Sequence, residues 1–363
     1  MKKFSLTLLI SFFLIKALAQ DNSTWISFFN KDSTLIGFKD RTGKVKIEPK
    51  FTRFTDAQRF NRIIAVKEKK GGKIFSYYLT KSGKVIRQNN LYIFDNGTDC
   101  ESEGFIRFRN KKTHKVGMYN GDGEIVIPAD YDNLLPVRNG MIMALKGGRW
   151  DISQHSEHNE FPWVGSKPVL IDIHNKLLVD KFQWDDNIDF YSLTINDQIN
   201  KSPIRQNYKG TNGKYYSFVN FDKEFKLWLR DSVLNNLSRA TLQKISYRSI
   251  AIWDKAKGWI KESKENFLNK NFEIIKSKLM EIVQTNSDYF ISTEGLNPYI
   301  YNTSEFEKYF DNCEQSKDWI YPIKTIVISH RSKANISQDQ ISFLRTDNGY
   351  KLIEVSIKTE NSR

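Results

Sequence analysis

The stretch GFKDRTGKV, from Gly37 to Val45, decides the fold of the first part of the chain. A glycine followed by Gly-Lys suggests a phosphate-binding loop, whose consensus is G-x-x-x-x-G-K-[ST]. Here five residues separate Gly37 from Gly43, and Val45 stands where the consensus needs a hydroxyl. Val45 also begins an alternating apolar run, which predicts a strand and not the helix whose N-terminus binds phosphate. The stretch is therefore predicted to be the turn of a β-hairpin.

The same stretch returns at a fixed interval of forty residues: GKV at 43–45, GKV at 83–85 and GEI at 123–125. Glutamate in the third copy excludes phosphate binding as the role of the lysine column. The turn glycines are predicted to adopt positive φ, which suits residues without a side chain. Self-similarity at a fixed period is typical of a repeat architecture. The predicted structural turn glycines are Gly43, Gly83 and Gly123.

The recurring columns resemble the WG repeat family, also written KWG. The third copy, residues 114–145, contains KVGMYNGDGEIVIPADYDNLLPVRNGMIMAL, and residues 35–66 and 74–108 follow the same pattern. These three units lack the tryptophan of the family name, and Trp150 keeps it at the start of a fourth. The resemblance implies an all-β array of hairpin units that serves as an interaction scaffold, and it does not imply an enzymatic activity.

Residues 1–19 have the layout of a secretory signal peptide. Lys2 and Lys3 precede an apolar run from Leu6 to Ile15, and Ala17-Leu18-Ala19 forms a small-x-small cleavage site. The run is shorter than the ~20 apolar residues that span a bilayer, and Lys16 interrupts it. We expect cleavage, export to the periplasm or the outside of the cell, and no stable membrane insertion afterwards. An uncleaved membrane anchor is the alternative.

Charge and cysteine content narrow the class of partners. The formal charge is +14, and removal of the three lysines of the leader lowers it to +11. The lysines of the rest of the chain are scattered among acidic residues. This distribution predicts a solvated surface and no nucleic-acid partner. Cys100 and Cys313 are the two cysteines of the chain, too few for a disulfide scaffold, and their pairing is left open.

The chain is predicted to be multidomain, with an N-terminal all-β repeat array of period about 40 followed by a C-terminal α+β domain. The predicted segments are the signal peptide at 1–19, WG-like repeats at 20–149, a degenerate repeat or capping β region at 150–215, and the α+β domain at 216–363.

The last of these segments shows a change of period. Apolar spacing predicts a helix from Phe221, capped by Asn220 or Asp222, and a second helix opened by Ser263. Strands follow, and Asn348-Gly349 predicts a final hairpin. The element order is similar to the nuclear-transport-factor-2-like fold, in which helices close a curved sheet around a pocket.

Candidate chemical groups are few. His155, His158 and Glu160 lack the H-E-x-x-H spacing of a helical zinc site, so this segment is predicted to be a solvated loop. Trp163 and Trp184 lie outside any clear period, and they are the candidate ligand-contact aromatics because indole rings stack on sugars and peptides. No catalytic, cofactor-binding or metal-binding residue is predicted, and no cofactor.

The sequence favours an exported, non-enzymatic binding or scaffold protein whose repeat surface contacts a protein or glycan at the cell envelope. One alternative is a C-terminal pocket domain that binds a small ligand or acts as an enzyme, with the repeats as a targeting module. A structural envelope component is the other alternative. The oligomeric state is not predicted.

The leader pattern predicts that the mature protein begins at Gln20, because signal peptidase cleaves after a small-x-small site. N-terminal sequencing of protein recovered from the envelope or the medium measures this. A chain that begins at Met1 and sediments with membranes would instead establish the uncleaved anchor.

Overall fold

The computed structural model describes residues 24–94, 96–151, 163–183, 185–254, 256–284, 287–331 and 336–357. The chain divides into two compact units: unit 1 is Met1–Lys167 with Ile171–Lys176, and unit 2 is Pro168–Leu170 with Leu177–Arg363. The predicted leader, the segment from His155 to Glu160, and Trp184 lie outside the described residues. Within the described ranges, no helix is long and apolar enough to cross a membrane.

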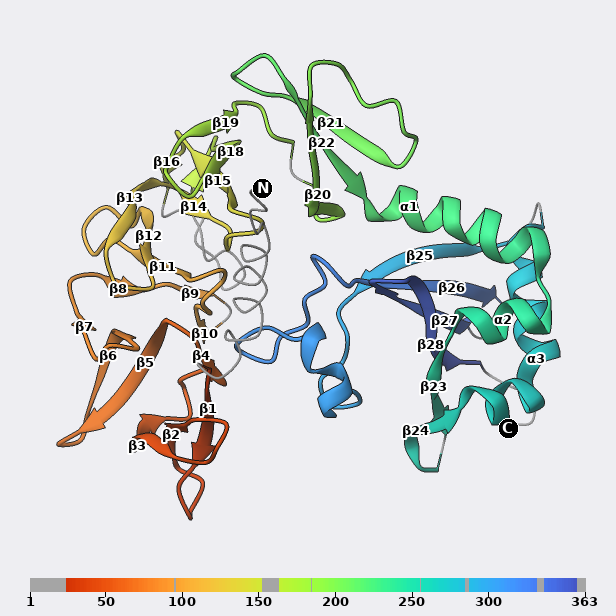
Figure 1. Cartoon of the computed structure of the whole chain (residues 1–363), viewed down its shortest axis with the longest axis horizontal. Coiled ribbons are helices and arrows are strands. Elements are labelled where there is room, and N and C mark those ends of the chain that lie inside the picture. The colour runs from red at the N-terminus through yellow and green to blue at the C-terminus, as the bar shows by residue number, and fades with distance from the viewer. Residues whose placement is uncertain are drawn as a thin grey trace, which may run out of the picture. The chain divides into compact units, whose positions relative to one another are not determined.

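Unit 1 consists of short strands joined by tight turns (Figure 1). A seven-stranded sheet has the order β4-β1-β2-β3-β5-β6-β7, and a four-stranded sheet has the order β13-β12-β11-β8. The division between the units falls within β18 (Lys167–Asp172). The other strands are β1 (Trp25–Phe29), β2 (Leu35–Lys39), β3 (Val45–Thr52), β4 (Arg59–Phe60), β5 (Ile63–Lys70), β6 (Lys73–Thr80), β7 (Val85–Ile86), β8 (Asn90–Leu91), β9 (Ile93–Phe94), β10 (Gly97–Thr98), β11 (Phe105–Arg109), β12 (Val116–Asn120), β13 (Ile125–Tyr131), β14 (Asn133–Leu134), β15 (Met141–Lys146), β16 (Arg149–Trp150) and β17 (Trp163–Val164).

One backbone turn recurs at 40–44, 80–84 and 120–124. In the first copy, the Asp40 amide donates to the Lys44 carbonyl (2.9 Å) and the Gly43 amide donates to the Asp40 carbonyl (3.0 Å). The other two copies form the same pair of bonds. The turn glycines Gly43, Gly83 and Gly123 have φ of 91°, 92° and 71°. Left-handed backbone of this kind closes hairpins whose twist matches the flanking strands.

The same turn also occurs at 311–315 in unit 2, and two further copies lie at 172–176 in unit 1 and at 210–214 in unit 2. The Asp172 amide donates to Lys176 (3.0 Å), and Asn175 takes the glycine's place with φ of 63°. The Gly210 amide donates to Lys214 (2.8 Å). The forty-residue period does not include these turns, and at Asn175 asparagine, which also tolerates left-handed backbone, replaces the glycine.

Gly37 and Gly117 stand where the repeat family has the glycine of its Trp-Gly pair. A side chain has no space at these two positions, and their φ angles are not the reason for glycine. A Cβ on Gly37 would lie 2.5 Å from the Ile47 carbonyl oxygen and 2.7 Å from the Pro49 nitrogen. Gly117 meets the facing strand β13 in the same way, and both pairs of strands carry a register shift at this place. A bulge therefore brings backbone against backbone where each glycine stands.

The second unit has Tyr77 at the position that Gly37 and Gly117 occupy in the other two. It lacks the close contact between two backbones, so a side chain fits there. Its strand β7 is two residues long and pairs with Tyr78 and Leu79, so the ladder ends before it reaches Tyr77. The freed position holds a phenol whose hydroxyl donates to Glu68 (2.6 Å).

Contacts between successive units hold the array together. Lys84 donates through Nζ to the carbonyls of Asp122 and Gly123 in the next turn (3.1 and 3.2 Å). Glu101 accepts from the amides of Arg62 and Ile63 (2.9 and 3.2 Å). Lys84 of the lysine column therefore links two successive turns, whereas Lys44 is exposed. One apolar cluster spans strands of successive units; it contains Ile63, Ala65, Tyr78, Ile86, Leu91, Ile106, Phe108 and Tyr119.

Unit 2 contains a three-stranded sheet of order β20-β22-β21 and a six-stranded sheet of order β24-β23-β28-β27-β26-β25. In the larger sheet β23 and β28 run parallel, and the other neighbours run antiparallel. The strands are β19 (Leu177–Val179), β20 (Ile188–Asn196), β21 (Arg205–Lys209), β22 (Tyr215–Asn220), β23 (Ser246–Asp254), β24 (Gly258–Ser263), β25 (Tyr289–Glu294), β26 (Ile323–Arg331), β27 (Ile336–Thr346) and β28 (Gly349–Ser356). The helices are α1 (Phe221–Trp228), a π-helical turn η2 (Leu229–Val233), a 3-10 turn η3 (Leu234–Asn236), α2 (Arg239–Ile245), α3 (Lys264–Glu281) and the 3-10 helix η4 (Ser304–Tyr309).

The helices α1, α2 and α3 pack on one face of the six-stranded sheet (Figure 1). Phe225, Leu242 and Leu279 from the helices meet Ile326 and Phe343 from the sheet in one buried cluster. The opposite face is covered by the segment that contains η4, with Tyr301 and Phe306 buried. Apolar side chains thus fill the central part of the space between helices and sheet.

Local signals in the sequence account for the helix starts. The Asn220 side chain accepts from the Lys223 amide (3.1 Å) and caps α1, and the Ser263 hydroxyl accepts from the Asn266 amide (3.3 Å) at the start of α3. The helix α2 was not predicted, since its seven residues are too few to show a period. The predicted domain start at residue 216 falls inside β22.

Replacing Gly123 with alanine is expected to destabilise unit 1 more than replacing Gly43. Both positions have positive φ, but a Cβ at 123 would collide with the Ile86 side chain, whereas nothing lies within 4 Å at 43. We expect a loss of about 1 kcal/mol for G43A and about 2–4 kcal/mol for G123A. Denaturant unfolding of the two variants measures this difference. Equal losses would show that the turn does not pack on the preceding unit.

Candidate functional site

Trp163, one of the two predicted contact aromatics, lies in an aromatic cluster with Trp150. The two indoles pair across β16 and β17 with ring centroids 4.9 Å apart and edge to face. The Lys115 ammonium lies 3.9 Å from the centre of the Trp163 ring, and His114 stacks on Trp150 at 4.6 Å. These rings therefore already have partners within the chain, and ligand contact by Trp163 stays a prediction.

A buried carboxylate anchors this cluster. Asp132 is fully buried, and it accepts from Lys115, from the Gly148 amide (2.6 Å) and from the Ser166 hydroxyl (2.7 Å). Three donors satisfy the charge, as a buried ion requires. The Lys115–Asp132 pair thus fixes the place where Trp150 and Trp163 meet, which is a structural role.

A cavity of about 530 Å³ opens between β3 and the β6–β7 hairpin. Trp25 and Tyr77 contribute aromatic surface to it, Glu48 a carboxylate, and Lys46, Lys50 and Lys81 three ammonium groups. Lys46 is paired with Asp40 (3.0 Å) and Lys50 reaches Glu68 (3.9 Å). It lies at the unit whose WG glycine is replaced by Tyr77, where the facing strand is short. Sequence reasoning had no signal for this site, because its residues come from β1, β3, β6, β7 and the turn at 80–84, and no column of the repeat unites them.

Lys81 is the distinctive member of this cavity. Its Nζ lies 5.0 Å from the centre of the Trp25 ring and is buried, with no hydrogen-bond acceptor in reach among the residues that the structure describes. Burial lowers the pKa of the Lys81 amine, and the Glu101 carboxylate acts in the opposite direction. An ammonium in this position is completed by an anionic or hydrogen-bond-accepting group.

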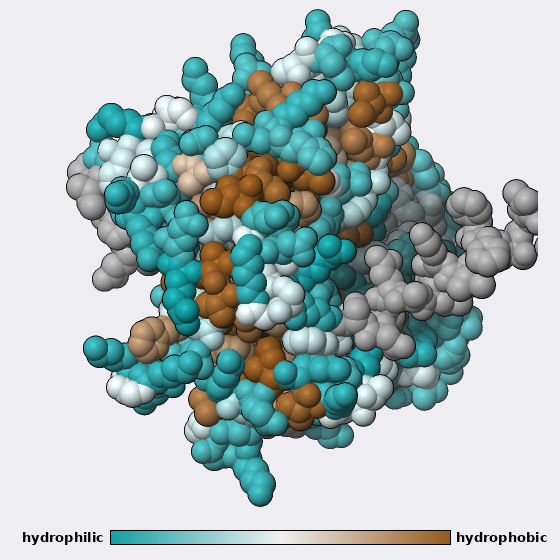
Figure 2. Space-filling model, turned by 60° about the vertical axis from the view of Figure 1, so that its left-hand side comes forward, coloured by the Kyte–Doolittle hydropathy of each residue, from teal (hydrophilic) through white to brown (hydrophobic). Residues whose placement is uncertain are grey.

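Apolar side chains also reach the surface at the period of the repeat. Val45, Val85 and Ile125 follow the turn glycines, and they are 40%, 41% and 47% exposed. Phe54 and Phe94, also forty positions apart, are 64% and 57% exposed. Figure 2 shows apolar residues at the surface in separate groups, with hydrophilic residues between them. The repeat thus presents separate apolar side chains at its own period, and scattered apolar residues of this kind are ordinary on a protein surface.

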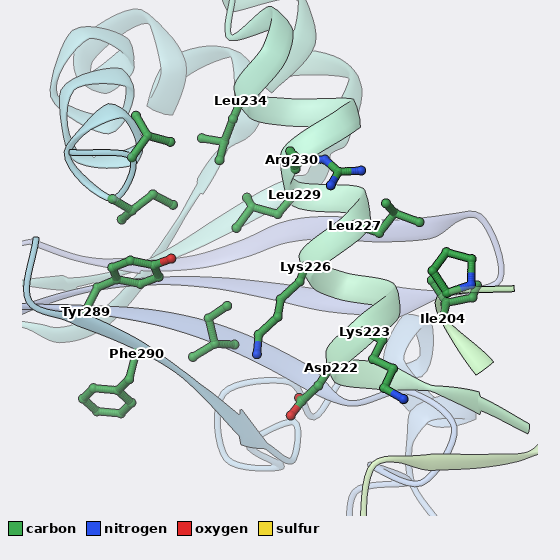
Figure 3. Close-up of a pocket in the computed structure, with 14 residues that line it drawn as sticks. Ile204, Asp222, Lys223, Lys226, Leu227, Leu229, Arg230, Leu234, Tyr289 and Phe290 are labelled. Carbon is green, nitrogen blue, oxygen red and sulfur yellow. The ribbon is translucent and has the colours of Figure 1, made fainter. Parts of the chain in front are cut away.

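Unit 2 has a larger groove, of about 900 Å³, between α1 and the strand β25 (Figure 3). Leu229 and Ile291 belong to its apolar lining, and Lys223, Lys226 and Arg230 bring positive charge from the helical side. Figure 3 shows the Lys226 amine and the Tyr289 ring directed into the space between the helix and the strand.

Buried ion pairs hold α1 beside the sheet. The Lys324 side chain is fully buried, and its Nζ donates to Asp222 (2.5 Å), Asn187 (2.9 Å) and Thr293 (2.6 Å). Burial lowers the pKa of Lys324, while Asp222 acts in the opposite direction. Arg345 makes the second tie, since it donates to Glu224 at 2.8 Å. The Asp222 charge is therefore engaged, and the groove keeps the excess of cations.

Another cluster of titratable groups in unit 2 is a set of ion pairs. His330 bonds to Asp339 (2.8 Å), and the Lys278 ammonium also reaches Asp339 (2.8 Å). Within the described ranges, no group of three or more His, Cys, Asp and Glu side chains is arranged to hold a metal ion. Cys100 and Cys313 are both disulfide-bonded.

The Glu354 carboxyl has a pKa that is raised into the neutral range. Burial raises its pKa to about 7, the Glu294 carboxylate adds to this rise, and a hydrogen bond from Tyr301 opposes it. The Tyr301 hydroxyl also donates to the Ile353 carbonyl (3.2 Å) in the apolar cluster of that face. No cavity described above includes Glu354, so its shift concerns stability.

Comparison with known proteins identifies the repeats. The family described as WG containing repeat matches residues 36–70 and 117–150. This chain carries WG repeats. The prediction is confirmed for these two segments, and the unit at 74–108 between them stays a prediction. No curated protein and no solved structure shows a significant match to the chain.

Replacing Glu354 with glutamine is expected to stabilise the protein at pH 8 and to leave it nearly unchanged at pH 5. A carboxyl whose pKa rises on folding binds a proton more tightly in the folded state, so its contribution to stability falls as pH rises from about 4.5 to about 7. The amide stays neutral, and we expect a gain of about 1–3 kcal/mol above pH 7. Thermal unfolding at both pH values, with the exposed Glu273→Gln as control, tests this. A gain that does not depend on pH would contradict it.

Proposed function

We propose that this protein is an exported, non-enzymatic binding or scaffold protein whose WG repeats contact an acidic protein or glycan at the cell envelope. The observation that carries the proposal is Lys81, whose buried ammonium has no acceptor among the described residues and whose side chain lines a cavity with Trp25, Tyr77 and two further lysines. Aromatic faces stack on sugars or peptide side chains, and the ammonium selects a negative group.

Export is supported by two independent features. The leader has the charged start, apolar run and small-residue cleavage site of a signal peptide. Both cysteines are disulfide-bonded, and disulfides persist mainly in oxidising compartments such as the periplasm and the cell exterior. We propose the same compartments for this chain.

A non-enzymatic role is supported by unit 2 as well. We propose that its helices and six-stranded sheet form an α+β domain of the nuclear-transport-factor-2-like kind. Buried side chains such as Phe225, Leu279 and Phe343 fill the middle of the space between them, and the open groove lies at the sheet edge beside β25. A ligand-binding or enzymatic domain with the repeats as a targeting module is the alternative.

Replacing Lys81 with methionine is expected to weaken partner binding. Losing a charged hydrogen bond in a buried site costs about 1.5–3 kcal/mol, or about tenfold or more in affinity. The probes are polygalacturonate as an anionic glycan and proteins of an envelope extract, each applied to the immobilised mature chain. The control is Lys44→Met, at an exposed lysine of the first turn.

The proposal is supported if the wild-type chain retains at least one probe, if K81M retains less of that probe, and if K44M retains as much as the wild type. If the wild-type chain retains neither probe, or if K81M and K44M retain them equally, the repeat cavity is not the binding site.

A further inference from the structure

The groove of unit 2 lies along the free side of a sheet. Among the described strands, β25 ends the six-stranded sheet and pairs on one side with β26. An edge strand presents backbone N–H and C=O groups to whatever lies beside it. Here α1 stands across a groove of about 900 Å³, so the edge faces a space large enough for further chain.

The side chains of β25 suit an extended partner. Tyr289 and Phe290 are 41% and 50% exposed, and successive residues of a strand point to opposite faces. Tyr289 and Ile291 share one face, and Figure 3 shows Tyr289 directed into the groove and Phe290 away from it. A strand laid beside β25 would therefore find an aromatic ring on each of its own faces.

The helical wall supplies charge selectivity. Lys223, Lys226 and Arg230 follow one another at spacings of three and four, which places them on one side of the helix. Asp222, the one acidic residue of the lining, is bound to the buried Lys324, and Arg230 is paired with Asp231 next to it in the chain (2.6 Å). The wall opposite β25 is therefore cationic, and it complements an acidic chain.

We propose that this groove binds an extended acidic peptide that adds a strand to β25. Backbone pairing with the edge supplies affinity, and alternate side chains supply specificity, as in strand addition generally. Acidic residues of the peptide meet Lys223, Lys226 and Arg230, and apolar residues at alternate positions pack on Leu229 and Ile291. The site is separate from the repeat cavity and does not depend on it.

The lining disfavours a lipid or a small anion. A lipid chain needs a continuous apolar channel, whereas three cations line one wall of this groove. A small anion would use those cations without the strand edge or the aromatic rings of Tyr289 and Phe290. An acidic strand uses all three features together.

The test uses the full mature chain and a fluorescent peptide of alternating glutamate and valine, matched in length to β25. We expect saturable binding by fluorescence anisotropy that weakens with added salt. Lys226→Glu should weaken binding about tenfold or more, as expected for charge reversal at the contact. Lys276→Glu, at an exposed lysine of α3 outside the groove, should leave it unchanged.

Two further measurements separate strand pairing from charge attraction. A peptide with proline in place of each valine cannot form the ladder and should bind much more weakly. Hydrogen exchange should slow at residues 289–294 when the valine peptide is bound. Equal binding of the proline peptide, unaltered exchange at 289–294, or equal affinity of K226E would overturn the proposal. Displacement of the peptide by dodecanoate without added protection of β25 would assign the groove to lipid instead.

Discussion

The repeat region depends on one backbone turn in which a left-handed residue closes a pair of hydrogen bonds across four positions. Gly43, Gly83 and Gly123 occupy it at φ of 91°, 92° and 71°, and Asn175 adopts the same conformation without being glycine. Since side-chain direction alternates along a strand, the turn sets which residues of the outgoing strand face the core. The register of each hairpin, and with it the burial of Phe51 or Ile127 on the outgoing strands, follows from this constraint.

Contacts between units then turn separate hairpins into one array, because a lone hairpin cannot bury its apolar face. Lys84 and Glu101 form hydrogen bonds with backbone groups of a neighbouring unit. These two charged side chains therefore stabilise the contact between units. Where the sequence departs from the repeat pattern, the packing between strands is less complete. Where Tyr77 replaces the WG glycine, the strands separate, and the Lys81 cavity opens there. The functional candidate is therefore at the least regular unit.

In unit 2, buried ion pairs position the helix α1. Lys324 with Asp222, and Arg345 with Glu224, hold the first turns of α1 beside the sheet. Breaking such a pair is costly because it leaves an unpaired charge in a buried place. The apolar cluster under the helices fills the interior, so the usable surface moves to the edge at β25. Binding at an edge agrees with a scaffold role better than with enclosed chemistry.

The sequence by itself determined the hairpin period, the turn glycines, the helix caps at Asn220 and Ser263 and the final hairpin, because each rests on contacts a few residues apart. It missed α2, which is too short to show a period, and it could not find Lys81 or the β25 groove. Only the tertiary structure brought Trp25, Tyr77 and Lys81 to one cavity and set α1 across from β25. Packing between distant segments decides those places, and no local spacing along the chain encodes it.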